Sequence, residues 1–457
     1  MTKLRLAVVG AGPAGIYASD ILLKTERAFD VSIDLFEQLP APYGLVRYGV
    51  APDHPRIKGV VTALREVLDR GGIRIFGNVR FGTDITLDDL KRHYNAVIFA
   101  TGAIRDADLA IPGIDAVGSF GAADFVSWFD GHPDVPREWT LDAASVAVVG
   151  NGNVALDISR ILAKHAIDLL PTEIPENVYE GLRASQVTDV HVFGRRGPAQ
   201  VKFTPLELRE LGELRDVDMV VYDEDFDYDE ASLAAIASNK QVKVIDRVLQ
   251  EWRTRPGANG AGGEASRRLH LHFWANPVEV RTDAEGRVAA LVYERTRPDG
   301  QGGVVGTGEL REVEIGQLYR AVGYFGSQLD GVPFDDRHGV IPNHEGQVLH
   351  PDSNELVPGL YATGWIKRGP VGLIGHTKSD AMETVQHLVN DQASWWQPED
   401  PSEEAIPALL AARGVAWTDL DGWHRLDEHE IALGAPHERA RIKVVPRDEM
   451  IRISRGE

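Results

Sequence analysis

The chain contains no cysteine among its 457 residues. This absence excludes disulfide bonds, thiolate metal sites, iron–sulfur clusters held by the protein and redox-active dithiols, because all of these require cysteine sulfur. If the protein moves electrons, a bound organic cofactor must carry them. We expect no bound metal.

Positive charge is also scarce, with 48 Lys and Arg against 69 Asp and Glu, which gives a formal net charge of −21. An acidic surface repels nucleic-acid phosphates and anionic lipid, so we expect neither as a partner. The apolar start at Leu4 is interrupted by a glycine cluster with Pro13, unlike a secretory signal, and no apolar run reaches the ~20 residues that span a bilayer. We therefore expect a cytoplasmic protein without membrane insertion.

Two similar segments, Leu4–Lys24 and Ser145–Lys164, each show a β-branched run, a glycine turn and a helical pattern. Further strand-like runs at Val31–Phe36 and Ala96–Gly102 alternate with helical segments, as a parallel sheet requires. The length and the 43% hydrophobic content allow more than one core. We predict an α/β fold with two doubly wound, Rossmann-like nucleotide-binding domains.

The first glycine turn has the pattern G-x-G-x-x-G, formed by Gly10, Gly12 and Gly15, with Ala14 at a variable position. Such a turn lets backbone N–H groups and the positive end of a helix approach a pyrophosphate. The next strand ends at Glu37, whose carboxylate can accept hydrogen bonds from ribose hydroxyls. The alternatives are glycines that serve only tight packing and a solvated strand-end acid.

The second turn begins at Gly150 and Gly152, and its following strand ends in Arg195 and Arg196. Guanidinium groups can clamp a ribose 2′-phosphate, which a carboxylate would repel, so this pattern favours NADP(H) over NAD(H). The interpretation requires an insertion around residues 171–175 to loop out, and the alternative is a pair of solvated arginines.

Two nucleotide sites in a chain without cysteine suggest that a hydride passes from a nicotinamide to a second dinucleotide. FAD suits the first site, because a flavin can divide an electron pair into single steps and because FAD has the adenylate half that the turn expects.

Four longer motifs occur in order along the chain. They are LFEQLPAPYGLVRYGVAPDHPRIK from Leu35, GNGNVALDISRIL from Gly150, GRRGPAQVKFTPLELREL from Gly194 and GWIKRGPVGLIG from Gly364. Together they resemble the adrenodoxin-reductase-like NADPH:ferredoxin reductases, from near the start of the chain to at least Asn390. The resemblance implies an FAD domain formed by residues 1–105 and 324–457, the latter with a C-terminal helical tail. An NADP domain at residues 106–323 would be inserted between the two parts.

The resemblance also implies site residues. The residues that match the family's FAD contacts are Glu37, Leu45, Val79, Trp365, Gly372, Leu373 and Ile374. Those that match its NADPH contacts are Asn151, Gly152, Asn153, Val154, Arg195, Arg196 and Glu207. The family places a proton-relaying catalytic cluster near the flavin, and its members match His54, Asp157 and Glu210.

Local sequence leaves alternatives for three of these residues. Gly372 is expected in the first turn of a helix that begins after Pro370, where the helix dipole would stabilise a reduced flavin. The alternative is a glycine cap without a ligand. Trp365 could be a core residue, and His54, in a proline-rich loop, could be a surface histidine.

The activity implied is that of a ferredoxin–NADP reductase, an enzyme that takes a hydride from NADPH onto FAD and passes single electrons to a small ferredoxin. The ferredoxin could carry a 2Fe-2S, 3Fe-4S or 4Fe-4S cluster, and we expect a monomer or weak dimer. The alternatives are an NADPH-dependent flavin oxidase or monooxygenase, and a redox-sensing flavoprotein subunit without turnover. A local docking patch of cations is expected in the flavin-side motifs, where Arg47, Arg56, Lys58, Lys367 and Arg368 could supply it. The alternative for each of them is an internal ion pair or a phosphate contact.

Overall fold

The computed structural model describes residues 3–457 except positions 261, 302 and 373. The chain forms two compact units. Unit 1 contains the chain up to Arg105, the segment Asp130–Asp134 and everything from Gly323 onward, and unit 2 contains Asp106–Phe129 and Val135–Val322. Short strands β5 (Arg105–Asp106) and β15 (Tyr324–Phe325) lie where the chain leaves and re-enters unit 1. No helix among the described residues is long and apolar enough to cross a membrane.

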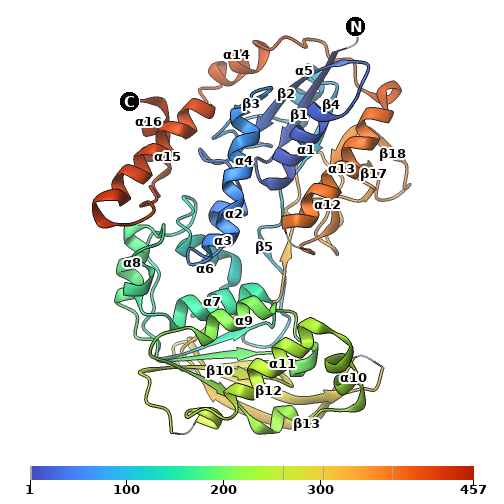
Figure 1. Cartoon of the computed structure of the whole chain (residues 1–457). Coiled ribbons are helices and arrows are strands. Elements are labelled where there is room, and N and C mark those ends of the chain that lie inside the picture. Colours follow the sequence, from blue (N-terminus) through green and yellow to red (C-terminus); the bar gives the residue numbers. More distant parts are fainter. Residues whose placement is uncertain (1–2, 261, 302, 373) are drawn as a thin grey trace. The chain divides into compact units, whose positions relative to one another are not determined.

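Unit 1 is built on a seven-stranded sheet to which both ends of the sequence contribute, as the blue and orange strands of Figure 1 show. In spatial order the strands are β16 (Asn343–His344), β17 (Gln347–Leu349), β18 (Leu356–Ala362), β4 (Ala96–Phe99), β1 (Lys3–Val9), β2 (Asp30–Phe36) and β3 (Ile73–Phe76). From β18 to β3 all neighbours are parallel, whereas β16 and β17 add an antiparallel edge.

Alternate residues of β1 enter two different cores, because successive side chains of a strand point to opposite faces. Leu6 and Val8 belong to one cluster, and Ala7 and Val9 to the other. Helices cover both faces, as a doubly wound sheet requires. The helices of unit 1 are α1 (Pro13–Lys24), α2 (Leu45–Tyr48), α3 (Pro55–Lys58), α4 (Val60–Asp69), α5 (Leu87–His93), α12 (Trp365–Arg368), α13 (Ile374–Asn390), α14 (Ala405–Ala412), α15 (Leu420–Gly434) and α16 (Arg447–Arg455).

Unit 2 contains a six-stranded parallel sheet. Its strands, in spatial order, are β6 (Ser119–Gly121), β14 (Gln317–Arg320), β7 (Ser145–Val149), β8 (Asp189–Phe193), β10 (Arg267–His272) and β9 (Val217–Val221). Its helices are α6 (Ala122–Phe129), α7 (Asn153–Ala163), α8 (Glu176–Arg183), α9 (Pro205–Gly212), α10 (Glu230–Ser238) and α11 (Lys240–Trp252).

A second sheet packs on one face of the six strands. Its antiparallel strands are β11 (Ala275–Thr282), β12 (Val288–Pro298) and β13 (Val304–Glu314). Val280 and Leu291 of this sheet share a core cluster with Val149 and Phe193 of the larger sheet. The predicted α/β class with two nucleotide-binding sheets is confirmed, but the sequence did not predict that a β-sheet would cover one face of unit 2.

Three histidines of unit 2 are buried side by side on β8 and β10. The rings of His191 and His270 stack with their centroids 4.2 Å apart, and Nδ1 of His191 lies 2.9 Å from Nε2 of His272. Nε2 of His270 lies 3.0 Å from a carboxylate oxygen of Asp189. Burial, reinforced by the neighbouring His270, lowers the pKa of His191 from 6.5 to about 3.

This shift predicts an acid-sensitive contribution to the stability of unit 2. Below pH 6.5 His191 binds a proton in the unfolded chain, whereas in the folded unit it stays neutral until near pH 3. The free energy of unfolding therefore decreases as the pH falls through this range, by up to about 1.4 kcal/mol per pH unit. Asp225, whose pKa burial raises to about 6, works in the opposite direction. His191→Asn keeps a polar atom near the position of Nδ1 without a titrating ring. We therefore expect its melting temperature to fall less than that of the wild type between pH 7 and pH 5, and equal slopes would contradict the prediction.

Candidate functional site

The first glycine turn joins β1 to α1 in unit 1, and its three glycines differ in what a side chain would meet at each position. Gly10 has a φ of +109°, and a Cβ atom there would lie 2.5 Å from the carbonyl oxygen of Ala100. A Cβ on Gly15 would lie 2.0 Å from the carbonyl oxygen of Gly10. At Gly12 the nearest atom would be the Cα of Gly44 at 3.9 Å, an ordinary van der Waals contact, so packing within the protein does not require glycine here. The chain needs the first and third glycines to fold, whereas the second leaves room for a ligand.

No side chain among the described residues caps the start of α1. Its N-cap is Gly12, which has no side chain to accept a hydrogen bond, and Ala14 in its first turn is only partly buried. The first N–H groups of a helix otherwise lack partners, so this terminus fits an anion such as a pyrophosphate.

Glu37 lies at the end of β2, beside this turn. Its buried carboxylate accepts the N–H of Ala11 at 2.9 Å on one oxygen and that of Leu39 at 3.1 Å on the other. Burial raises its pKa to about 7, although these N–H bonds oppose the shift. Each carboxylate oxygen can accept a further bond, so the group fits two ribose hydroxyls, which would also stabilise the ionised form.

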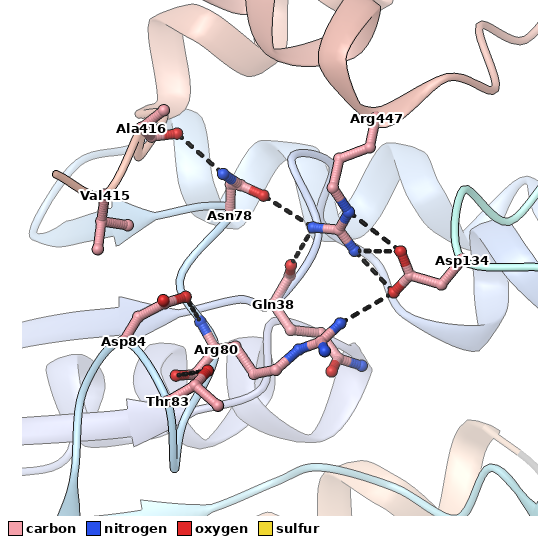
Figure 2. A pocket seen from close by; sticks show the side chains of 9 residues that line it. All are labelled: Gln38, Asn78, Arg80, Thr83, Asp84, Asp134, Val415, Ala416 and Arg447. Carbon is pink, nitrogen blue, oxygen red and sulfur yellow. Dashed lines mark hydrogen bonds and ion pairs between the residues drawn. The ribbon is translucent and has the colours of Figure 1, made fainter.

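A cavity of about 480 Å³ in unit 1 is lined by Gln38, the residue that follows Glu37 (Figure 2). Arg447, in the first turn of α16, reaches into it and donates to the carbonyl of Gln38 at 2.8 Å and to the side-chain oxygen of Asn78 at 2.7 Å. Asp134 pairs with Arg447 at 2.7 Å and with Arg80 at 3.0 Å. The C-terminal helix therefore forms part of the wall at this edge, a role that no local sequence motif indicates.

The second glycine turn, between β7 and α7 in unit 2, repeats the geometry of the first. The N–H of Gly150 donates to Phe193 at the end of β8, as that of Gly10 donates to Phe36 at the end of β2. A Cβ on Gly150 would lie 2.2 Å from the carbonyl oxygen of Ala321, whereas one on Gly152 would meet nothing within 4 Å. The internal repeat predicted from the sequence is therefore a structural repeat.

The residues around the second turn also offer unused hydrogen-bonding groups. Among the described residues, the buried side-chain nitrogen of Asn151 has no hydrogen-bond partner. Asn153 accepts the N–H of Thr204 at 2.9 Å, which fixes the start of α7, and Val154 is partly exposed. Because an unpaired buried donor is costly, the nitrogen of Asn151 fits a phosphate oxygen.

Arg195 and Arg196 follow the end of β8 after one residue, Gly194, and β8 is the parallel neighbour of β7. The intervening segment loops out and includes α8, as the NADP interpretation requires. The carbonyl of Arg195 accepts a hydrogen bond from the hydroxyl of Thr296 at 2.7 Å, which holds the backbone. Neither guanidinium has an acidic partner in the described parts of the chain, so both are available for an anion.

Comparisons with known proteins agree with this arrangement. A family model described as pyridine nucleotide-disulphide oxidoreductase matches residues 4–196. NADPH-ferredoxin reductase FprA of Mycobacterium tuberculosis is 38% identical over 474 residues, which cover 100% of both chains. Mitochondrial NADPH:adrenodoxin oxidoreductase of Homo sapiens is 37% identical over 459 residues, which cover 98% of this chain and 91% of that protein. The chain belongs to the family of NADPH-ferredoxin and adrenodoxin reductases.

A solved structure of Mycobacterium tuberculosis FprA in complex with NADPH matches with a TM-score of 0.89 and 37% identity, covering 99% of this chain and 100% of that one. The predicted membership of the ferredoxin reductase family and the oxidoreductase class are thus confirmed. Because the chain has no cysteine, this reductase cannot use the disulphide chemistry named in the family model.

The remaining FAD residues predicted from the reductase family all lie in unit 1. Leu45 begins α2 and Trp365 begins α12, and both are partly exposed, so Trp365 is not a core residue. The side chain of Val79 is buried in a hydrophobic cluster, and its N–H donates to the carbonyl of Glu37 at 2.8 Å, so its contact with FAD stays a prediction.

The segment before α13 differs from the prediction in one respect. Gly372 has a φ of +89°, which a helix does not allow, and α13 begins only at Ile374. The prediction that Gly372 lies in the first turn of this helix is therefore wrong. Leu373 lies outside the described residues.

The three predicted catalytic residues are divided between the units. His54, in unit 1, is 3% exposed, and its carbonyl accepts the N–H groups of Ile57 and Lys58. It is therefore not a surface histidine. Asp157 on α7 and Glu210 on α9 lie in unit 2. That Asp157 and Glu210 form one proton-relaying cluster with His54 stays a prediction.

Glu207 lies on α9 with its carboxylate 3.4 Å from the guanidinium of Arg160, which also donates to Asp157 at 2.7 Å. Arg160 was missed at the sequence level, because an arginine within a helical pattern looks like a solvated residue until the fold buries it.

Four of the five cations predicted to form a docking patch are ion-paired within unit 1, as expected if each is a member of an internal ion pair. Arg47 is 5% exposed and pairs with the buried Glu430 at 2.6 Å. Lys58 lies 3.5 Å from Asp130, and Lys367 and Arg368 both pair with Asp380, at 3.0 and 2.8 Å. Among the five, only Arg56 is exposed without an acidic partner in the described chain. Arg47 and Lys58 pair with acids from distant parts of the sequence, whereas the partner of Lys367 and Arg368 lies on the next helix, α13.

Proposed function

We propose that the protein takes a hydride from NADPH onto FAD, bound by unit 1, and passes single electrons to a ferredoxin-type iron–sulfur protein. Family membership gives the reaction class and the cofactors FAD and NADP(H). The observation that carries the assignment of cofactors to units is the pair of equivalent glycine turns with opposite charges beside them. The first lies next to the carboxylate of Glu37, and the second next to Arg195 and Arg196.

In unit 1 the FAD pyrophosphate is held at the turn of Gly12, where there is room for it, by the N–H groups at the start of α1. Glu37 accepts the ribose hydroxyls. Leu45, the backbone of Val79 and the indole of Trp365 contact the remainder of the cofactor, and the N-terminus of α13 stabilises negative charge near the flavin. Bound FAD supplies the capacity to accept two electrons together and release them singly.

In unit 2 the turn Asn151–Val154 holds the pyrophosphate of NADPH, and Arg195 and Arg196 hold its 2′-phosphate. Glu207 contacts the nucleotide, and the catalytic residues His54, Asp157 and Glu210 position groups and move protons near the flavin. Hydride transfer itself needs no protein base, so these three affect the rate and not the identity of the reaction.

The partner is a small ferredoxin, with a 2Fe-2S, 3Fe-4S or 4Fe-4S cluster. A monomer or weak dimer in the cytoplasm remains our prediction. Of the five cations expected in the flavin-side motifs, Arg47 and Lys367 are buried, so docking draws on Arg56, Lys58 and Arg368.

Visible spectra under anaerobic conditions test this function. Purified protein is expected to show flavin absorbance that NADPH bleaches and that returns when an oxidised ferredoxin is added, with a further round on each addition of NADPH. A colourless preparation that takes up no FAD would overturn the proposal. Bleaching without turnover would indicate a redox sensor, and rapid peroxide formation in air without ferredoxin would indicate an oxidase.

A further inference from the structure

One buried guanidinium joins three carboxylates in unit 2. The side chain of Arg160 is 1% exposed, and its Nη2 donates to Oδ1 of Asp157 at 2.7 Å. Its Nη1 lies 3.4 Å from Oε2 of Glu207 and 3.9 Å from Oε2 of Glu210. The side chain of Glu207 is 4% exposed, that of Asp157 14% and that of Glu210 26%, so the group ranges from the interior to the surface.

These contacts connect two helices that begin next to the second glycine turn. Asp157 and Arg160 lie one turn apart on α7, in the favourable order of acid before base. Glu207 and Glu210 lie one turn apart on α9. The hydrogen bond from the N–H of Thr204 to Asn153 fixes the start of α9 against the start of α7 at 2.9 Å. Arg160 therefore adds a second connection, one to two turns further along both helices.

A guanidinium is suited to this position because its planar fork can donate to several acceptors at once, whereas a lysine ammonium acts as a compact point charge. Without a cation here, three neighbouring carboxylates would repel one another and rotate toward solvent. Asp157 would then lose the orientation that its bond to Nη2 imposes.

We propose that Arg160 is a positioning residue for the flavin-reducing reaction and that it acts by holding Asp157 in its reactive orientation, with Glu207 as the second anchor of the guanidinium. This inference rests on the function proposed above. Arg160 itself need not touch either cofactor.

The test compares Arg160→Lys, Asp157→Asn and the double variant by stopped-flow measurement of flavin reduction at saturating NADPH. Arg160→Lys is expected to slow flavin reduction at least tenfold, because lysine keeps the positive charge but cannot contact Asp157 and Glu207 at the same time. If Arg160 acts through Asp157, the double variant should be no slower than the slower single variant, since interacting residues are not additive. Multiplied effects in the double variant would overturn the proposal, as would an Arg160→Lys enzyme with the wild-type rate.

A matched control separates positioning from mere stability. Arg5 and Asp34 form an ion pair at 2.8 Å in unit 1, with both side chains 1% exposed, on β1 and β2. Arg5→Lys should lower the melting temperature while leaving the reduction rate unchanged.

Should Arg160→Lys not fold, the variant Arg160→Gln with Glu207→Gln removes one charge of each sign and is compared with Asp157→Asn in the same way. A wild-type protein that NADPH does not reduce would refute the proposed function, whereas a reducible wild type with an unaffected Arg160 variant refutes only this inference.

Discussion

Gly152→Ala is expected to leave unit 2 folded and to weaken NADPH binding by roughly tenfold to a hundredfold, or about 1.4 to 2.8 kcal/mol. Gly152 has a φ of −119°, which alanine adopts without strain, and a Cβ atom there would meet no protein atom within 4 Å. The added methyl group would instead occupy the space above the start of α7 where a pyrophosphate must approach the N–H groups. Alanine is also a poorer N-cap than glycine, which should cost less than about 1 kcal/mol of stability.

Gly150→Ala, two residues earlier, provides the contrast. Its φ of +148° is unsuitable for alanine, and the new Cβ atom would lie 2.2 Å from the carbonyl oxygen of Ala321. We expect it to destabilise unit 2 by on the order of 2 to 4 kcal/mol. Isothermal titration with NADPH and thermal melting distinguish the two effects. A Gly152→Ala protein that binds NADPH as tightly as the wild type would show that the nucleotide does not approach this turn.

Arg195→Ala is expected to reduce the preference for NADPH over NADH by roughly tenfold to a hundredfold, about 1.5 to 3 kcal/mol, which is the cost of losing a charged hydrogen-bonding partner of a phosphate. The effect should fall on NADPH alone, because NADH carries no 2′-phosphate for the guanidinium to bind. Steady-state kcat/KM with each nucleotide measures this preference.

Arg215→Ala is the appropriate control for the loss of one positive charge. Arg215 belongs to the same unit, is 68% exposed and pairs with Asp168 at 2.7 Å, so its removal should leave the selectivity unchanged. An equal loss of selectivity in both variants would mean that general electrostatics governs the choice of nucleotide. A wild-type protein that already prefers NADH would contradict the role of both Arg195 and Arg196.

Local features of the sequence were sufficient to predict those parts of the site that depend on residues close together in the chain. The turn at Gly10 requires glycine for its own backbone conformation, so its pattern could be recognised without the fold. Glu37 and Arg195 could be found for a related reason, because each follows a short apolar strand that leads to the same edge of a sheet as the preceding turn.

Other parts of the site depend on segments that meet only after folding. Arg447 reaches the edge near Glu37 from the far end of the chain, and Asp134, inside the range predicted for the inserted domain, groups with unit 1. Arg47 and Lys367 could not be told from docking cations until the fold showed that acids from α15 and α13 pair with them. A charged residue carries no local sign of whether its partner will be water or another side chain.

The sequence by itself determined the two glycine turns, the α/β class and the exclusion of thiol chemistry, and it predicted the preference for a 2′-phosphate, since these follow from backbone conformation, periodicity, composition and charge within short stretches. Only the tertiary structure decided that Arg160 contacts Asp157, Glu207 and Glu210, that a second sheet covers one face of unit 2 and that four of the five expected docking cations form ion pairs. These features arise from long-range pairing, and burial makes such pairing necessary because an ion removed from water requires a partner of opposite charge.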